Sequence, residues 1–161
     1  MRLIPILALV LVSGCVLHNI SPQELLRDSV MGLNDEARWV RMDLAAERVA
    51  PPYRSAYRAN HQAWGRSIQI ADVEILGAEL DADAEGAVST VSISWYSYST
   101  MMLHNTVVRQ RWLSAGRSYV LVSERVVDGD PDLLAPPESD EDGDEDGDGA
   151  EPDGRVARGS D

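Results

Sequence analysis

The period of the apolar residues changes once along this chain, at Gly65. Before Gly65, apolar side chains recur every three or four residues, which is the spacing of one face of an α-helix. After it they recur at every second residue, as in a strand that is buried on one face. Helices followed by a run of strands indicate an α+β fold, in which N-terminal helices pack on a curved antiparallel sheet of about four strands.

Three helices are expected before the change. Residues 21–24 (Ser-Pro-Gln-Glu) match a capping box with proline at the first helical position, so the first helix begins there and ends near Asn34. A second helix follows Asp35 and ends at residues 51–52 (Pro-Pro), where a third begins and continues to Gly65. Their expected apolar faces comprise Leu25, Leu26, Val30, Met31, Leu33; Trp39, Met42, Ala46, Val49; and Tyr53, Ala56, Tyr57, Asn60, Ala63, Trp64.

Four strands are expected after Gly65. In the first strand, the apolar parity switches between Ile70 and Val73, which predicts a β-bulge and a strongly bent strand. A polar loop at residues 81–86 then turns the chain. The other expected strands lie at residues 88–100, at about 103–113 and at 119–127.

The charge is concentrated at the C-terminus. The 161 residues have a formal net charge of −13, and residues 128–161 account for −12 of it. This acidic balance excludes a nucleic-acid binder, which needs a basic surface to displace phosphate counterions. The chain contains no lysine, which excludes a Schiff-base lysine and a P-loop.

The N-terminus has the features of a secretory signal. Arg2 precedes an apolar run over residues 3–12, which is shorter than the roughly 20 residues that cross a bilayer as a helix. Ser13 and Gly14 follow, and then comes Cys15, the chain's single cysteine. The sequence Val-Ser-Gly-Cys at this place resembles the lipobox of bacterial lipoproteins. An ordinary secretory signal with a coincidental cysteine is the alternative.

The lipobox resemblance implies cleavage after Gly14 and a diacylglycerol, with further acyl chains such as palmitate, on Cys15. The bilayer is then a partner through acylated Cys15, because two or three acyl chains give stable anchoring. Val16, rather than aspartate, follows the cysteine, which implies sorting to the bacterial outer membrane with the domain facing the periplasm. The expected organisation is a signal peptide at 1–14, a lipidated tether at 15–20, an α+β domain at 21–134 and a disordered acidic tail at 135–161.

A second resemblance concerns the domain. The order of helices and long strands, ending in a hairpin over residues 109–121 with Trp112 and Tyr119 around a turn, resembles nuclear-transport-factor-two-like and cystatin-like folds over about residues 35–127. The resemblance implies a curved sheet wrapped around helices. Some members are isomerases or dehydratases that use Asp, His and Tyr inside the cone, but no catalytic residue can be transferred to this chain, so none is predicted.

The candidate partner or ligand surface comprises Trp95, Tyr96 and Tyr98, in a strand without charges. Alternation places Tyr96 and Tyr98 on one face with Ser92, Ser94 and Thr100, and places Trp95 on the other face with Val91 and Ile93. The preferred interpretation is that one face packs on the helices and the other is a mildly polar sheet surface. The functional alternative is a ligand or partner surface, because tyrosines provide large rigid contact areas; an envelope protein or a glycan is then the expected partner.

Four arginines surround the last hairpin: Arg109, Arg111, Arg117 and Arg125. They are expected on a solvent face. The functional alternative is a basic patch for lipid head groups or for the chain's own acidic tail.

No metal site or cofactor is predicted. His18, His61 and His104 lie far apart, there is no HExxH motif, and a single cysteine excludes a multi-cysteine centre. His61 and His104 are expected to have structural roles at the surface or half-buried. Residues 142–153 follow the spacing of a calcium-binding EF-hand loop, but with aspartate in the last place. A solubilising tail is the preferred interpretation; site-specific calcium binding and binding of a basic partner are the alternatives.

These observations predict a non-enzymatic binding or accessory module of the bacterial envelope. The alternative is a small isomerase- or hydrolase-like enzyme with a pocket inside the cone. A buried pocket that holds a carboxylate with a raised pKa beside His61 or tyrosines would favour the enzyme. An interior filled by Trp, Leu and Val would favour the binding module.

Overall fold

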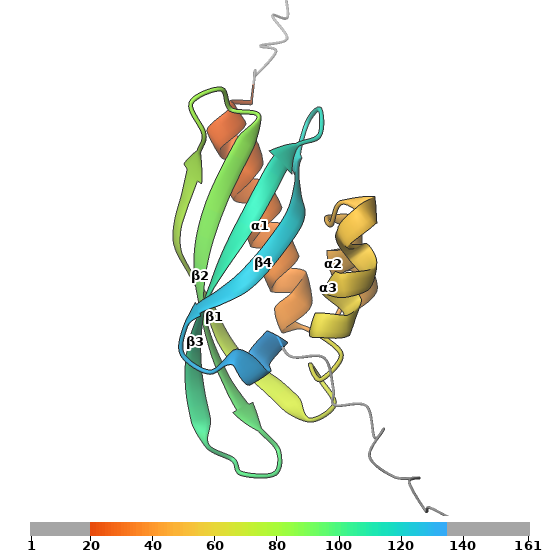
Figure 1. The fold of residues 1–161 in the computed structure, drawn as a ribbon, viewed down its shortest axis with the longest axis vertical. Coiled ribbons are helices and arrows are strands. Elements are labelled where there is room, and N and C mark those ends of the chain that lie inside the picture. Colours follow the sequence, from red (N-terminus) through yellow and green to blue (C-terminus); the bar gives the residue numbers. More distant parts are fainter. Residues whose placement is uncertain (1–19, 135–161) are drawn as a thin grey trace, which may run out of the picture.

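The structure is a computed structural model that describes residues 20–134. It confirms the α+β class: helices precede a four-stranded antiparallel sheet (Figure 1). The predicted signal peptide, Gly14, Cys15 and the acidic tail lie outside the described residues. The elements are α1 (Pro22–Arg38), α2 (Met42–Glu47), η1 (Pro51–Tyr53), α3 (Arg54–Asn60), β1 (Ile68–Leu80), β2 (Gly86–Ser97), β3 (Leu103–Ser114), β4 (Tyr119–Asp128) and η2 (Pro131–Leu134).

The first helix begins where the sequence predicts. Ser21 caps α1: its hydroxyl accepts a hydrogen bond from the backbone of Glu24, whose carboxylate accepts one from the Ser21 backbone in return. The predicted end near Asn34 is wrong, because α1 continues to Arg38. Asn34 is buried, and its side-chain amide donates to the Val30 carbonyl 2.8 Å away and to Gln110 in the sheet. A residue that usually favours helix ends is thus held inside a helix by a tertiary contact.

The predicted second helix also differs from the observed one. Residues 39–41 form a turn, and Trp39, expected on an apolar helix face, is 64% exposed. The turn closes α1 with two hydrogen bonds, from Arg41 N to Glu36 O and from Val40 N to Ala37 O, while Val40 has a left-handed φ of 59°. This pattern is a Schellman motif, in which glycine is the usual residue at the left-handed position.

The third helix ends earlier than predicted, at Asn60. The chain then makes tight turns over residues 61–67, and Gly65 adopts a φ of +73° that glycine accommodates without strain. Trp64 remains in the core at 4% exposed, and its indole N–H donates to the Leu133 carbonyl 2.9 Å away. Contacts between these turns and η2 therefore tie the end of the domain to α3.

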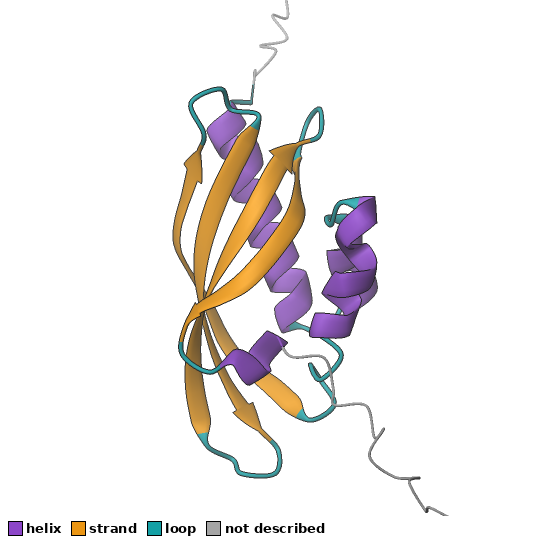
Figure 2. Ribbon diagram, viewed as in Figure 1, coloured by secondary structure: helices purple, strands orange, loops and turns teal. Residues whose placement is uncertain are grey.

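The strands pair consecutively, in the order β1-β2-β3-β4, and all pairs are antiparallel. The predicted bulge in β1 is confirmed by register shifts between Ile70 and Asp72 and between Ile75 and Gly77. The sheet is strongly twisted, with α1 behind its upper half and α2 and α3 beside β4 (Figure 2). One sheet face therefore packs on α1, and we call the opposite one the outer face.

The core between the inner face of the sheet and the helices is filled with large side chains. Leu26, Leu33, Trp112, Leu121 and Leu133 are each no more than 1% exposed. Burying each such side chain stabilises the fold by about 1.5–3 kcal/mol. The predicted faces of β2 are confirmed, since Val91, Ile93 and Trp95 belong to this core.

A polar network crosses the same core. Asn34 and Gln110 exchange two amide hydrogen bonds, of 3.0 and 3.1 Å, between α1 and β3. The Ser89 hydroxyl donates to Gln110 Oε1 at 3.0 Å and accepts from the Trp112 indole at 2.9 Å. Because these buried groups bind one another, the network fixes how α1 sits on the sheet.

Candidate functional site

The two tyrosines of the candidate surface lie together at the end of β2. Tyr98 is 47% exposed, and its hydroxyl donates to Gln69 Oε1 at 2.9 Å. Tyr96 is half-buried and contacts Tyr98 edge to face, with ring centroids 6.1 Å apart. Both rings therefore have defined positions on the protein surface.

Trp95 does not belong to this surface. It is 3% exposed, because strand alternation turns it into the core. Its indole N–H donates to Thr106 Oγ1 at 3.0 Å, and its ring stacks on His104 with centroids 4.4 Å apart. Its role in the described structure is to pack the sheet interior.

The exposed apolar surface continues from Tyr98 into the β2–β3 connection. Met101, Met102 and Leu103 are 68%, 63% and 70% exposed. We call residues 98–103 the hairpin tip. It lies at the end of the molecule opposite the start of α1 (Figure 1). The candidate surface predicted from the sequence did not include these three residues, although three consecutive apolar residues in a turn were a readable signal.

A buried carboxyl group is the second feature with chemical potential. The Glu124 side chain of β4 is 1% exposed, and burial raises its pKa to about 8, although a hydrogen bond with Tyr53 partly opposes that rise. Its Oε1 lies 3.5 Å from Nδ1 of His61, whose side chain is 3% exposed. Burial lowers the pKa of His61 to about 4. The pair is therefore uncharged at neutral pH, as expected where desolvation outweighs ion-pair attraction.

Two tyrosines complete this buried cluster. Tyr53, Tyr57 and His61 follow at intervals of four residues, which places them on one side of η1 and α3. His61 Nδ1 lies 2.8 Å from the Tyr57 carbonyl, which can only accept, so Nδ1 carries the proton. Burial raises the pKa of Tyr53 to about 12, with a further contribution from Glu124. The Tyr57 hydroxyl and Glu124 Oε1 have no hydrogen-bond partner within residues 20–134.

The sequence did not identify this cluster. His61 was expected at the surface or half-buried, which is wrong because the residue is buried, at 4% exposed. Glu124 was not singled out, since strict alternation from Leu121 would turn Ser123 inward instead. A register shift places Leu121 opposite Trp112 and Ser123 opposite Arg111, so β4 contains an extra residue and Glu124 points inward.

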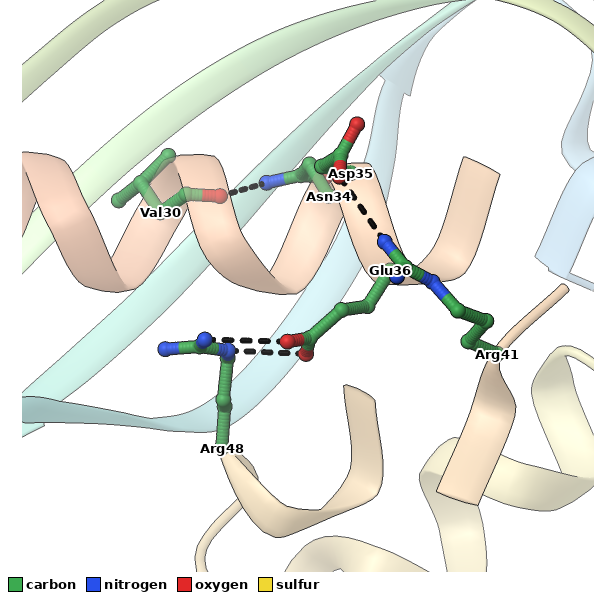
Figure 3. Close-up of polar contacts among 6 residues, drawn as sticks. All are labelled: Val30, Asn34, Asp35, Glu36, Arg41 and Arg48. Atoms are coloured by element: carbon green, nitrogen blue, oxygen red, sulfur yellow. Dashed lines mark hydrogen bonds and ion pairs between the residues drawn. The ribbon is translucent and has the colours of Figure 1, made fainter. Parts of the chain in front are cut away.

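The described surface pockets lie away from the buried cluster. One, of about 300 Å³, lies between α2 and the start of β4 and is lined by Glu36, Arg48 and Tyr119 among others. Glu36 and Arg48 form a bidentate ion pair with distances of 2.8 and 3.0 Å (Figure 3). The charges of Glu36 and Arg48 offset each other, and Glu47 adds a third charged side chain to the pocket lining. A second pocket, of about 160 Å³, lies between α1 and β1 beside Asn34.

Two other pairs of acidic and basic side chains also contact each other. Asp35 accepts a 3.0 Å bond from Arg41 across the turn that ends α1 (Figure 3). Half-buried His104, as expected from the sequence, lies near the start of β3 with its Nδ1 3.0 Å from Asp130. Within the described residues, no group of three or more His, Cys, Asp or Glu side chains is placed to hold a metal ion. His18 and the EF-hand-like segment lie outside those residues.

No helix between residues 20 and 134 combines the length and apolar character needed to cross a membrane.

Comparison with known proteins gives a likeness of fold. No protein-family model matches the chain, and no curated protein matches it. The fold is similar to the solution structure of a SEC-C motif containing protein from Rhodopseudomonas palustris, with a TM-score of 0.50 and 12% sequence identity. The match covers 59% of this chain and 73% of that one. At this identity the likeness concerns the arrangement of helices and strands alone.

Proposed function

We propose that the protein is a bacterial envelope lipoprotein, anchored in the outer membrane through acylated Cys15, whose periplasm-facing domain is a non-enzymatic binding module. The lipobox-like sequence before Val16 supports the anchor. The observation that carries the binding role is the hairpin tip, an exposed apolar end on a domain whose interior is filled. Contiguous exposed apolar surface at one end of a domain is typical of protein-binding sites.

The position of the hairpin tip supports this assignment. Residues 16–20 reach at most about 18 Å, which keeps the start of α1 close to an anchor on Cys15. The hairpin tip lies at the other end of the domain (Figure 1). An anchored domain would therefore present Tyr98, Met101 and Met102 away from its own bilayer.

The chemistry of the tip favours a protein partner over a glycan. Met101, Met102 and Leu103 offer apolar contact without hydrogen-bonding groups, and methionine adapts to irregular apolar pockets. Tyr98 adds a rigid ring that Gln69 holds in place. An envelope protein with an apolar groove would bury these side chains.

Crosslinking in cells tests the binding role. A photo-crosslinking amino acid replaces Met102 in the full-length chain, and a matched variant carries it at exposed Arg27 on α1. A crosslinker at position 102 should capture one abundant envelope protein, and a crosslinker at position 27 should capture much less of it. The yield from position 102 should fall when the chain also carries Cys15→Ala. Equal capture from both positions, or capture of glycan alone, would overturn the proposal of a protein-binding tip.

An acid–base enzyme is the second candidate function, and Glu124 is the observation that favours it. A carboxylic acid that keeps its proton near neutral pH beside a histidine can serve as a general acid. Screening carbonyl compounds and esters by NMR of the Glu124 carboxyl carbon tests this role. A compound that moves this signal and loses affinity in Glu124→Gln would support the enzyme, whereas compounds that move only the hairpin-tip signals would support the binding module.

A further inference from the structure

Two arginines face each other on the outer face of the sheet. Arg109 of β3 and Arg125 of β4 are direct partners in the strand register, and both are exposed. Like charges directly opposite each other destabilise an antiparallel pair. Neither guanidinium forms an ion pair or a hydrogen bond with any residue in the described part of the chain. The fold thus holds two positive charges together with no counter-charge from residues 20–134.

Neighbouring residues do not offset this charge. Arg111 lies two residues from Arg109 on the same face and is bound to Asp81 at 2.7 Å. Thr90 and Ser123, opposite these arginines in the register, are uncharged. Glu124, next to Arg125 in β4, points into the domain, and its side chain is buried. Asp128, opposite Val107, is the next acidic residue of β4 and forms no ion pair with residues of the described structure. We call Arg109, Arg111 and Arg125 the outer arginine surface.

The same chain contains the complementary charge. Residues 138–153 include ten Asp and Glu and no Arg, whereas residues 1–127 are nearly neutral, with thirteen acids and twelve arginines. This acidic segment starts four residues after Leu134, where η2 ends. Measured from Leu134, an extended chain reaches about 14 Å at Glu138 and about 65 Å at Asp153. The segment is therefore long enough to pass around β4 to the outer face.

We propose that the acidic segment 138–153 binds the outer arginine surface of its own chain. Covalent connection gives the segment an effective concentration in the millimolar range, so weak carboxylate–guanidinium contacts suffice for substantial occupancy. The contact covers the outer face near β3 and β4 and leaves the hairpin tip free. Because the surface and its occupant are both exposed charges, salt weakens the contact steeply.

Paramagnetic broadening in the full-length chain tests this contact. The chain carries Cys15→Ala and Gly147→Cys, is solubilised in detergent, and receives a nitroxide label at position 147. The amide signals of Arg109 and Arg125 are measured at 20 mM and 500 mM salt. Two double variants each remove two positive charges. The test variant combines Arg109→Gln with Arg125→Gln, and the control combines Arg27→Gln with Arg66→Gln. Arg27 and Arg66 are also exposed and form no ion pair with described residues.

The proposal predicts strong broadening of both amide signals at 20 mM salt and at least a threefold weaker effect at 500 mM salt. The Arg109/Arg125 variant should lose most of the broadening on β3 and β4, and the Arg27/Arg66 variant should retain it. Equal losses in the two variants, or broadening spread evenly over the domain, would overturn the proposal. A mixture of nitroxide-labelled protein at natural isotope abundance and ¹⁵N protein without the nitroxide must show no broadening. Broadening in this mixture would identify a second copy of the chain as the occupant.

Discussion

His61 Nδ1 and Glu124 Oε1 lie 3.5 Å apart in a part of the domain where both side chains are almost completely buried. The contact joins the residue that follows α3 to β4, across 63 positions of the chain. Burial makes both groups uncharged at neutral pH. The stability of this junction therefore depends on protonation, whether or not the cluster takes part in chemistry.

The first prediction concerns the pH dependence of stability. Folded Glu124 keeps its proton up to about pH 8, whereas the ordinary value is 4.5, so its contribution to stability falls as the pH rises. Folded His61 stays neutral down to about pH 4, against an ordinary 6.5, so its contribution falls as the pH drops below 6.5. The two effects oppose each other between pH 4.5 and 6.5, and only that of Glu124 acts between pH 6.5 and 8.

We therefore expect the free energy of unfolding to fall by about 2 kcal/mol from pH 6.5 to pH 8, and Glu124→Gln to remove most of this fall. Urea denaturation at several pH values measures both quantities. The test compares only how the free energy of unfolding changes with pH in the wild type and in Glu124→Gln. A loss of stability that is the same at every pH in the variant therefore does not affect the result. Parallel slopes for the two proteins would show that Glu124 is ionised in the folded state.

The second prediction concerns the Asn34–Gln110 pair. Gln110→Met keeps the side-chain length but leaves Oδ1 of Asn34 without its hydrogen-bond donor in the core. This substitution should lower the free energy of unfolding by about 2–4 kcal/mol. Asn34→Leu should have a similar cost. The double variant should be more stable than the sum of the two losses implies, by about 1–3 kcal/mol, because it leaves fewer unpaired groups. Additive losses in denaturant unfolding would contradict a coupled pair.

The third prediction compares two glycines. Gly65 has a φ of +73°, and a Cβ there would lie 2.5 Å from Cγ1 of Val40, so Gly65→Ala should cost about 1–3 kcal/mol. Gly77 has no neighbour within 4 Å of such a Cβ and no left-handed φ, so Gly77→Ala should change stability by no more than about 0.5 kcal/mol. Thermal unfolding of both variants measures the difference, and equal shifts would refute the strain at residue 65.

Much of the fold could be predicted from local patterns. The capping box at Ser21, the alternation in β2 and the parity switch in β1 depend on near neighbours in the chain, and all three are confirmed. The continuation of α1 past Asn34 could not be predicted, because it depends on a hydrogen bond to Gln110, 76 positions away.

The two candidate sites, the hairpin tip and the buried cluster around Glu124, also differ in how far local sequence patterns could predict them. Tyr98 was identified from its strand, and the structure adds its exposed neighbours in the turn. Glu124 was hidden because a bulge in β4 reverses the face that strict alternation assigns to it. Its burial also depends on Tyr53 and His61, which belong to another part of the chain and lie beside β4 only in the folded domain.

The lipid anchor on Cys15 determines whether the hairpin tip projects from a membrane, so the mass of the mature protein is the most direct test of the account. We predict that membranes of cells expressing the wild-type chain contain a protein that lacks residues 1–14 and carries diacylglycerol on Cys15. Cys15→Ala should leave the membrane-anchored, acylated form undetectable. A wild-type protein whose Cys15 carries no lipid would contradict the account. So would a wild-type protein that fractionates like Cys15→Ala and differs from it in mass only by the substituted side chain.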